Sequence, residues 1–277
     1  MSGQLLQRRI ERFGPSEYEH LLEVENIHLS FEGLKAIDGV SFKVNDGELF
    51  AIIGPNGAGK TSLFNSINQV YRPQEGDIRW KGESLMGLKP NVTAERGIAR
   101  TFQNIALYAH MTVLENILTG RHVRMNSGWV GAAFWWGRAK REEMANREIV
   151  EGIIDFLEIE QWRKYPVGLL PYGIQKRVEL GRALAMDPEL LLLDEPVAGM
   201  NLEETEDMAR FILDVQDELG ITIVLVEHDM GLVMDIADRV LVVDFGKPIA
   251  LGEPADIQQN PNVIKAYLGE EVEIAQQ

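Results

Sequence analysis

Residues 54–62 read Gly54-Pro55-Asn56-Gly57-Ala58-Gly59-Lys60-Thr61-Ser62, and this stretch decides the fold. An apolar run over 49–53 precedes it and predicts a buried strand, and a helical pattern begins near Leu63. Strand, glycine-rich turn and helix in that order are typical of a phosphate-binding loop, although a glycine-rich turn that binds nothing has the same outline. The glycines let backbone N–H groups point toward phosphate oxygens, at the positive end of the helix dipole. Lys60 is then placed to reach the β- and γ-phosphates, and the Thr61 hydroxyl is placed to hold Mg²⁺.

Two further apolar runs end in polar side chains. Residues 190–193 predict a buried strand that ends in Asp194 and Glu195, and residues 221–226 predict another that runs into His228. Active-site groups of open parallel sheets gather at the carboxyl ends of the strands. We therefore expect Asp194 to orient the Mg²⁺ shell, Glu195 to polarise an attacking water and His228 to contact the γ-phosphate. The alternative interpretations are two solvated acids and an ordinary polar histidine.

The first hundred residues contain shorter, alternating patterns. Residues 22–29 and 40–44 alternate apolar and polar side chains, which predicts half-buried strands, and residues 77–82 predict another. Together they indicate a small antiparallel sheet beside the nucleotide core. Phe31 follows the first of these strands, where it could stack on an adenine ring or belong to the core.

The middle of the chain contains several helical patterns. Thr112 can cap a helix while Glu115 reaches back to it. Residues 142–157 are strongly helical, residues 169–186 predict a helix that starts after the Pro-Tyr-Gly of 171–173, and a further helix starts near Asn201.

Composition narrows the class of protein. The chain has 277 residues, of which 45% are hydrophobic and 25% charged, which suits one large α/β domain or two small subdomains. The net charge of -16 argues against a general nucleic-acid binder, which would carry a basic surface. There is no cysteine, so disulfides, thiolate metal sites and a cysteine nucleophile are excluded. No apolar run approaches the ~18 residues that cross a bilayer, so we expect any membrane role to come through a partner.

Two segments, residues 1–20 and 128–137, fit the predicted arrangement of strands and helices less well. Residues 1–20 form an appendage with Leu6, Ile10 and Phe13 at helical spacing, which indicates either a basic amphipathic helix or a loosely ordered tail. Residues 128–137 are rich in tryptophan and are followed by basic side chains. They could contact a protein or a membrane interface, or form a helical hairpin that packs its own aromatics.

Together these motifs resemble the ATP-binding subunits of ABC transporters, from about Leu22 to Gly269. The resemblance implies an α/β fold: a P-loop NTPase (RecA-like) core with a parallel central sheet, an antiparallel β subdomain and an α-helical signature subdomain. It places the cassette at 21–269, with the helical subdomain at about 104–186 and a C-terminal tail at 270–277.

The same resemblance assigns roles to single residues, with ATP as the nucleotide and Mg²⁺ as its ion. Phe31 matches the adenine-stacking aromatic, residues 54–61 match the Walker A loop and residues 190–194 match Walker B. The remaining matches are Glu195 to the general base, His228 to the switch histidine, and Gln103 to the Q-loop glutamine that contacts Mg²⁺ and the attacking water.

The chain departs from the family at its signature, LSGGQ, which binds the γ-phosphate of the other subunit. The corresponding residues are Leu170-Pro171-Tyr172-Gly173-Ile174, so proline replaces the serine and isoleucine replaces the glutamine. Gly173 and the helix N-terminus remain, so the stretch 171–173 can still bind the anion through backbone N–H groups and the helix dipole. The D-loop, residues 198–201, ends in Asn201 rather than aspartate, and this asparagine also suits a helix N-cap.

These departures resemble the branch that serves uptake of hydrophobic, chiefly branched-chain, amino acids, and so does the ending at 261–269. Within that branch the chain looks like the longer of two paired ATPases. Related members import urea, short amides or aromatic acids. A soluble ABC ATPase of DNA repair or translation, a binding-only regulatory cassette and an exporter remain as alternatives.

The resemblance also implies partners. We expect a head-to-tail dimer with a second ATP-binding subunit, either a copy or a paralogue, docked on transmembrane permease subunits at the cytoplasmic face of the cell membrane. A periplasmic or extracellular substrate-binding protein would act indirectly, and no nucleic acid is expected. We further expect Trp129, Trp135 and Trp136 to help dock the permeases.

Overall fold

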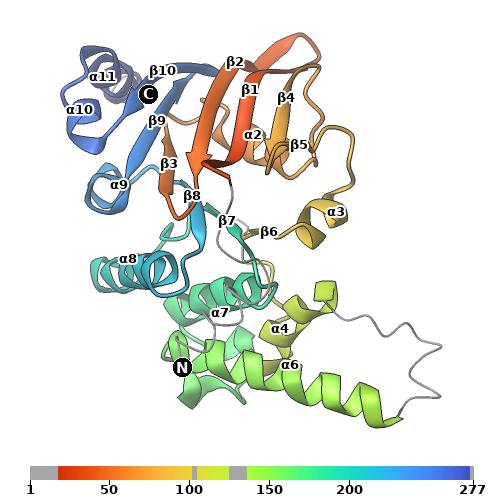
Figure 1. Cartoon of the computed structure of the whole chain (residues 1–277). Coiled ribbons are helices and arrows are strands. Elements are labelled where there is room, and N and C mark those ends of the chain that lie inside the picture. The colour runs from red at the N-terminus through yellow and green to blue at the C-terminus, as the bar shows by residue number, and fades with distance from the viewer. Residues whose placement is uncertain (1–17, 102–104, 125–135, 275–277) are drawn as a thin grey trace. The chain divides into compact units, whose positions relative to one another are not determined.

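The computed structural model describes residues 18–101, 105–124 and 136–274, and it has an α/β architecture (Figure 1). The described chain divides into two compact units. One, the helical unit, comprises Ala94–Leu191 and Pro196–Gly220. The other, the strand unit, comprises residues 18–93, Leu192–Glu195 and residues 221–274.

An antiparallel sheet occupies the N-terminal part of the strand unit. Its strand order is β2-β1-β4-β5, formed by β1 (His20–Phe31), β2 (Leu34–Asn45), β4 (Glu75–Trp80) and β5 (Glu83–Ser84). Val24 pairs with Phe42 on one side and with Ile78 on the other. Glu32 and Gly33 join β1 to β2 with φ angles of 48° and 92°, as a two-residue hairpin turn requires. The predicted antiparallel sheet is confirmed, and its first two strands are longer than the alternating patterns suggested.

The central sheet of the strand unit has the order β10-β9-β3-β8-β7. β3 (Leu49–Ile53) runs parallel to β8 (Thr222–Val226) and to β9 (Arg239–Asp244), while β10 (Lys247–Gly252) is antiparallel to β9. Every residue of β3, of β8 and of β7 (Leu190–Asp194) is buried. This full burial explains why their sequences are continuous apolar runs without alternation.

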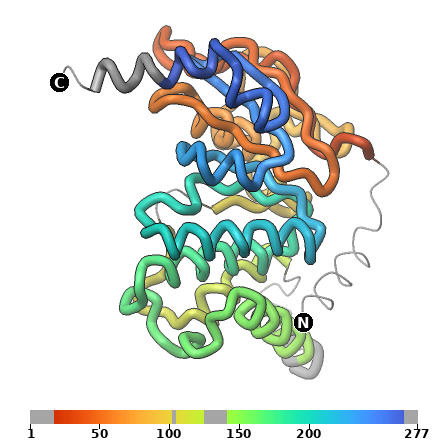
Figure 2. Tube along the Cα trace, turned by 90° about the vertical axis from the view of Figure 1, so that its left-hand side faces the viewer, coloured from red at the N-terminus to blue at the C-terminus, as the bar shows by residue number. Residues whose placement is uncertain are grey.

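Four helices accompany this sheet. α2 (Lys60–Ile67) follows β3, and α9 (Met230–Ile236) follows β8. α10 (Pro254–Gln258) and α11 (Pro261–Ile274) close the chain and pack beside β10, where Figure 2 shows them in dark blue. α11 continues to Ile274, into the residues from 270 on that were expected to form a C-terminal tail.

The helical unit contains α4 (Val113–Thr119), α6 (Trp136–Phe156), α7 (Tyr172–Leu184) and α8 (Leu202–Asp217). Short elements complete it: β6 (Ile98–Arg100), η1 (Gly120–Arg124), η2 (Glu160–Trp162) and η3 (Val167–Leu169). The residues of α3 (Pro90–Glu95) are divided between the two units. The Thr112–Glu115 capping box at the start of α4 is confirmed, since the Thr112 hydroxyl accepts from the Glu115 amide and the Glu115 carboxylate accepts from the Thr112 amide.

A buried arginine ties three parts of the helical unit together. The Arg121 side chain donates to Asn146 Oδ1 of α6 at 3.0 Å and to the carbonyl of Ala185, just after α7, at 2.8 Å. It also forms an ion pair with Asp187 at 2.5 Å. A guanidinium can satisfy several acceptors at once because its donors lie in a fixed plane.

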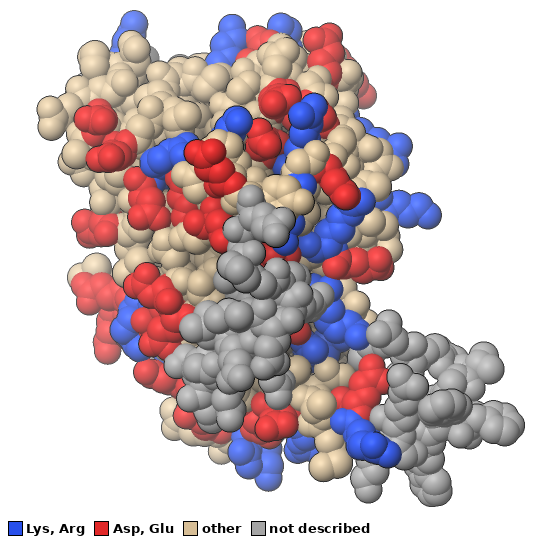
Figure 3. Space-filling view, viewed as in Figure 1, with Lys and Arg blue, Asp and Glu red and all other residues tan. Residues whose placement is uncertain are grey.

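Acidic and basic side chains are interspersed on the face drawn in Figure 3. Many of the described ones form ion pairs with neighbours of the same unit, such as Lys43 with Glu23 at 2.9 Å. No helix among the described residues is long and apolar enough to span a bilayer.

We predict that Arg121→Met lowers the free energy of unfolding by about 2–4 kcal/mol, because it leaves buried acceptors on α6 and after α7 without their donor. Urea unfolding followed by far-UV circular dichroism measures this change. Arg147→Met is the matched control, since Arg147 is exposed and lies 3.9 Å from Glu151. The control should cost less than about 0.5 kcal/mol, and equal effects of the two substitutions would contradict the role given to Arg121.

Candidate functional site

The phosphate loop follows β3 directly and leads into α2, as predicted. Gly59 is the residue before the helix, with a left-handed φ of 99°, and its carbonyl accepts the first helical bond from the Leu63 amide at 2.9 Å. Within the loop the Ala58 amide donates to the Pro55 carbonyl at 3.1 Å. The exposed Thr61 and the half-exposed Ser62 lie in the first turn of α2.

Two neighbouring segments lie very close to the backbone of this loop. A Cβ added at Gly54 would lie 2.0 Å from the carbonyl oxygen of Val243 in β9, and one at Gly59 would lie 2.3 Å from that of Ala36 in β2. In addition, the Gly246 amide, in the turn between β9 and β10, donates to the Ala58 carbonyl at 3.0 Å. Backbone groups of neighbouring strands therefore contact the loop from both sides, and only glycine fits at Gly54 and Gly59, the two points of contact. We call this set of backbone contacts the clasp.

Sequence reasoning did not find these clasping residues. It assigned residues 239–249, which form the β9–β10 hairpin, no part in the site. The position of this hairpin against the phosphate loop depends on the parallel pairing of β9 with β3.

Lys60 lies inside the loop. Its side chain is almost buried, with 7% exposed, and its ammonium group donates to the carbonyls of Gly54 at 2.5 Å and Pro55 at 3.0 Å. A cation surrounded by the loop backbone in this way is suited to bind an anion at the same place.

Asp194 and Glu195 come from the carboxyl end of β7. Asp194 is buried, with 1% exposed, which contradicts the alternative of a solvated acid at this position. Glu195 has a φ of 49°, in a region that non-glycine residues rarely adopt, and its amide donates to the Val226 carbonyl at 2.9 Å. Such strained backbone is often found at functional sites.

His228 follows β8 and the fully buried Glu227. The His228 side chain is 57% exposed, and its Nδ1 lies 3.6 Å from Glu227 Oε2. The same carboxylate oxygen accepts from the His228 amide at 3.0 Å. Glu227 thus holds the backbone and faces one ring nitrogen of a histidine that otherwise projects toward solvent.

The strand order brings these residues to one edge of the sheet. β8 lies between β3 and β7, with Ile52 of β3 opposite Val226 of β8. The bond from Glu195 to Val226 then sets the end of β7 beside the end of β8. The phosphate loop, the two carboxylates and His228 therefore leave neighbouring strands at their carboxyl ends, as the sequence predicted.

Phe31 is the last residue of β1 and is 42% exposed, so the alternative of a core position is wrong. Its ring meets Tyr71 edge to face at a centroid distance of 5.0 Å. This pairing keeps the Phe31 ring in place while leaving part of it open to a planar ligand.

The signature residues lie in the helical unit at the start of α7. Pro171 is the N-cap and offers no side-chain hydrogen bond, and Gly173 is buried within the first turn. α7 begins at Tyr172, slightly earlier than predicted. Burial and the nearby Glu179 carboxylate both raise the pKa of Tyr172, so its phenol stays protonated and can donate at neutral pH.

Some predicted residues lie outside the part of the chain that the structure describes. They are Gln103, Trp129 and Trp135, together with most of residues 1–20. Trp136 is the first residue of α6.

Oxygen donors are available for an ion beside the phosphate loop. The Thr61 hydroxyl and the Asp194 carboxylate are hard ligands of the kind that Mg²⁺ prefers. Mg²⁺ is usually held by one or two such protein groups together with substrate phosphates, so this donor set fits it.

Two profiles of known protein families match this chain. The profile of the ABC transporter family matches residues 37–198. The chain belongs to the ABC transporter ATP-binding family. A second profile, described as branched-chain amino acid ATP-binding cassette transporter, matches residues 247–273.

Individual relatives of this cassette cover most of its length. It is 40% identical to the high-affinity branched-chain amino acid transport ATP-binding protein BraF of Pseudomonas aeruginosa, over 90% of this chain and 98% of that protein. Identity to LivG of Escherichia coli, which has the same descriptive name, is 37% with the same coverage. A crystal structure of the ADP conformation of an ATP-binding cassette from an ABC transporter matches with a TM-score of 0.79 and 33% identity, over 91% of this chain and 100% of that one. The predicted fold class is confirmed.

We predict that Gly54→Ala weakens ATP binding about ten- to a hundredfold, because the new methyl group meets a backbone carbonyl that cannot rotate away. Isothermal titration calorimetry with ATP measures the affinity. Gly57→Ala is the matched control, since Gly57 also has a positive φ, of 80°, but has no heavy atom within 4 Å of an added Cβ. A methyl group at Gly57 displaces no neighbour, so the affinity should change less than about threefold, although left-handed strain lowers stability. Equal losses in both variants would contradict the clasp.

Proposed function

We propose that this cassette powers the uptake of branched-chain or other hydrophobic amino acids. As a member of its family it is an ATPase subunit of a transporter. The observation that carries the proposal is the 40% identity to BraF over 90% of the chain. The C-terminal match at 247–273 supports the same assignment with an independent part of the sequence.

We assign ATP binding to the strand unit. The amides of 54–62 surround the phosphates, and the Lys60 ammonium, already inside the loop, pairs with the β- and γ-phosphate oxygens. Phe31 stacks on the adenine ring with Tyr71 behind it. Thr61, Asp194 and Gln103 would hold Mg²⁺, which would neutralise negative charge on the phosphate oxygens.

Hydrolysis then depends on groups at the strand ends. Glu195, whose backbone φ is 49°, takes a proton from the attacking water as general base. His228 and Gln103 contact the γ-phosphate and sense its loss. Glu227 orients His228 by accepting from its amide and facing Nδ1.

A second cassette completes each site. The N-terminus of α7 binds the γ-phosphate held by the loop of the other subunit, through the backbone N–H groups of Tyr172 and Gly173 and the dipole of a 13-residue helix. Pro171 has no N–H to donate. ATP therefore favours a closed head-to-tail dimer, and hydrolysis releases it, which is a shift in population between two states.

The partners follow from this cycle. Permease subunits docked on the helical subdomain, about 104–186 within a cassette of 21–269, convert closure into alternating access at the cytoplasmic face of the membrane. A substrate-binding protein outside the membrane selects the cargo. The tryptophans of 128–137 contribute to docking, while residues 1–20 and 270–277 lie outside the cassette.

We predict that Glu195→Gln lowers ATP hydrolysis at least about a hundredfold, because the amide cannot accept the proton from water. ATP binding persists, so the variant accumulates as an ATP-bound dimer, measured by size-exclusion chromatography with light scattering. Glu206→Gln, on the exposed face of α8, is the control and should hydrolyse ATP at the wild-type rate. Unchanged hydrolysis in the Glu195 variant would remove this residue from the base role.

We predict that vesicles containing the cassette, its permeases and its binding protein take up labelled leucine when ATP is inside. Excess isoleucine or valine should suppress this uptake, because the side chains are similar in size and polarity. Urea, short amides and aromatic acids should not compete. Uptake of urea or an aromatic acid in place of leucine would reassign the cargo while leaving the ATPase assignment intact.

A further inference from the structure

We propose that Tyr172 is a positioning residue that fastens the signature stretch, residues 171–173, to the D-loop, residues 198–201, of the same chain. The two segments would then be presented to the second subunit as one rigid piece. This inference rests on the proposed function, in which both segments act across a dimer.

The first contact is made by Tyr172 itself. Its hydroxyl donates to the carbonyl of Ala198 at 3.1 Å. Its ring lies over Gly199, where an added Cβ would be 3.5 Å from the ring edge, and Gly199 has a left-handed φ of 80°. The side chain therefore spans from the first turn of α7 to the backbone of the D-loop.

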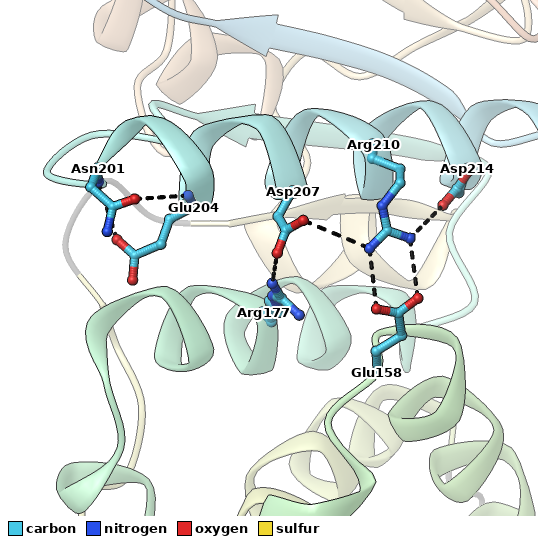
Figure 4. Close-up of polar contacts among 7 residues, drawn as sticks. All are labelled: Glu158, Arg177, Asn201, Glu204, Asp207, Arg210 and Asp214. Carbon is cyan, nitrogen blue, oxygen red and sulfur yellow. Dashed lines mark hydrogen bonds and ion pairs between the residues drawn. The ribbon is translucent and has the colours of Figure 1, made fainter.

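A second contact joins the same two segments on the other side. Asn201 and Glu204 form a capping box at the start of α8, drawn in Figure 4. The Glu204 carboxylate also lies against Gly173, where an added Cβ would be 2.6 Å from Glu204 Oε1. The signature glycine is thus packed against the first turn of α8, which follows the D-loop directly.

Further along, α7 and α8 are joined by charged side chains (Figure 4). Arg177 of α7 forms an ion pair with Asp207 of α8, and Arg210 of α8 pairs at 3.1 Å with Glu158, which follows α6. The two guanidinium groups lie 4.7 Å and 4.4 Å from the centroid of the Phe211 ring. Because these contacts fix the two helices together, a shift of α7 would carry the D-loop with it.

The side chains of the signature stretch explain why its backbone must be held in place. Pro171 and Ile174 stand where the family has serine and glutamine, so the side chains offer no polar group to phosphate. Only backbone N–H groups remain for this purpose, and their effect depends on accurate placement. The family has glycine at the position of Tyr172, and a glycine could not reach Ala198.

The test uses the full chain with Tyr172→Phe, which removes the hydroxyl and keeps the ring. Hydrogen exchange of the Met200 amide reports on the D-loop, because this amide donates to the Val197 carbonyl at 3.0 Å. We expect its exchange to accelerate about three- to tenfold, the effect of losing one neutral hydrogen bond. In the assembled transporter, kcat for ATP should fall by a similar factor while KM changes less than about twofold.

Tyr165→Phe is the matched control, because Tyr165 is an exposed tyrosine of the same unit that packs edge to face on Trp162. It should leave exchange and kcat unchanged. Tyr172→Gly, which restores the family residue, should accelerate exchange at least as much as the phenylalanine variant.

Unchanged Met200 exchange in Tyr172→Phe would overturn the fastening, and faster exchange with unchanged kcat would overturn its role in the reaction. The exchange measurement needs no nucleotide. Absence of ATP hydrolysis by the wild-type transporter would therefore count against the proposed function and not against the Tyr172 contact.

Discussion

The close approach of two backbone carbonyls to the phosphate loop is the constraint on which the site depends. Val243 of β9 and Ala36 of β2 lie so near to Gly54 and Gly59 that no side chain fits at either position. The loop therefore keeps its curvature because neighbouring strands hold it there, in addition to the intrinsic freedom of its glycines. The Lys60 ammonium is held inside that curve by the loop's own carbonyls.

The parallel sheet extends this constraint to the remaining groups. Because β3, β8 and β7 are neighbours, their carboxyl ends deliver a cation, two carboxylates and a histidine to one edge. The burial of Asp194 and Glu227 places acidic groups where water screens them little, so their charges act strongly on nearby groups. Left-handed backbone at Glu195 is the strained element of this edge, and its bond to Val226 holds it.

In the helical unit, contacts between neighbouring segments hold the backbone of the signature stretch. Its signature has lost the polar side chains of the family, and what remains is the backbone at the start of α7. The contacts of Tyr172 with Ala198 and of Glu204 with Gly173 restrict that backbone. Beyond it, Arg177 connects α7 to α8 through its ion pair with Asp207 and its contact with the Phe211 ring. Rigid placement of the backbone N–H groups at the start of α7 thus replaces the hydrogen bonds that the family's polar signature side chains would make.

The sequence by itself determined the strand–loop–helix order at 49–67, the buried strands ending at Asp194 and Val226, the capping box at Thr112 and the helix N-cap at Asn201. These features are local, because glycine, apolar runs and capping residues act on the chain within a few positions. Only the tertiary structure decided which strands are neighbours, that the β9–β10 turn clasps the phosphate loop, and that Tyr172 meets Ala198. Contacts of this kind join residues far apart in the chain and depend on packing, which no pattern within a short window encodes.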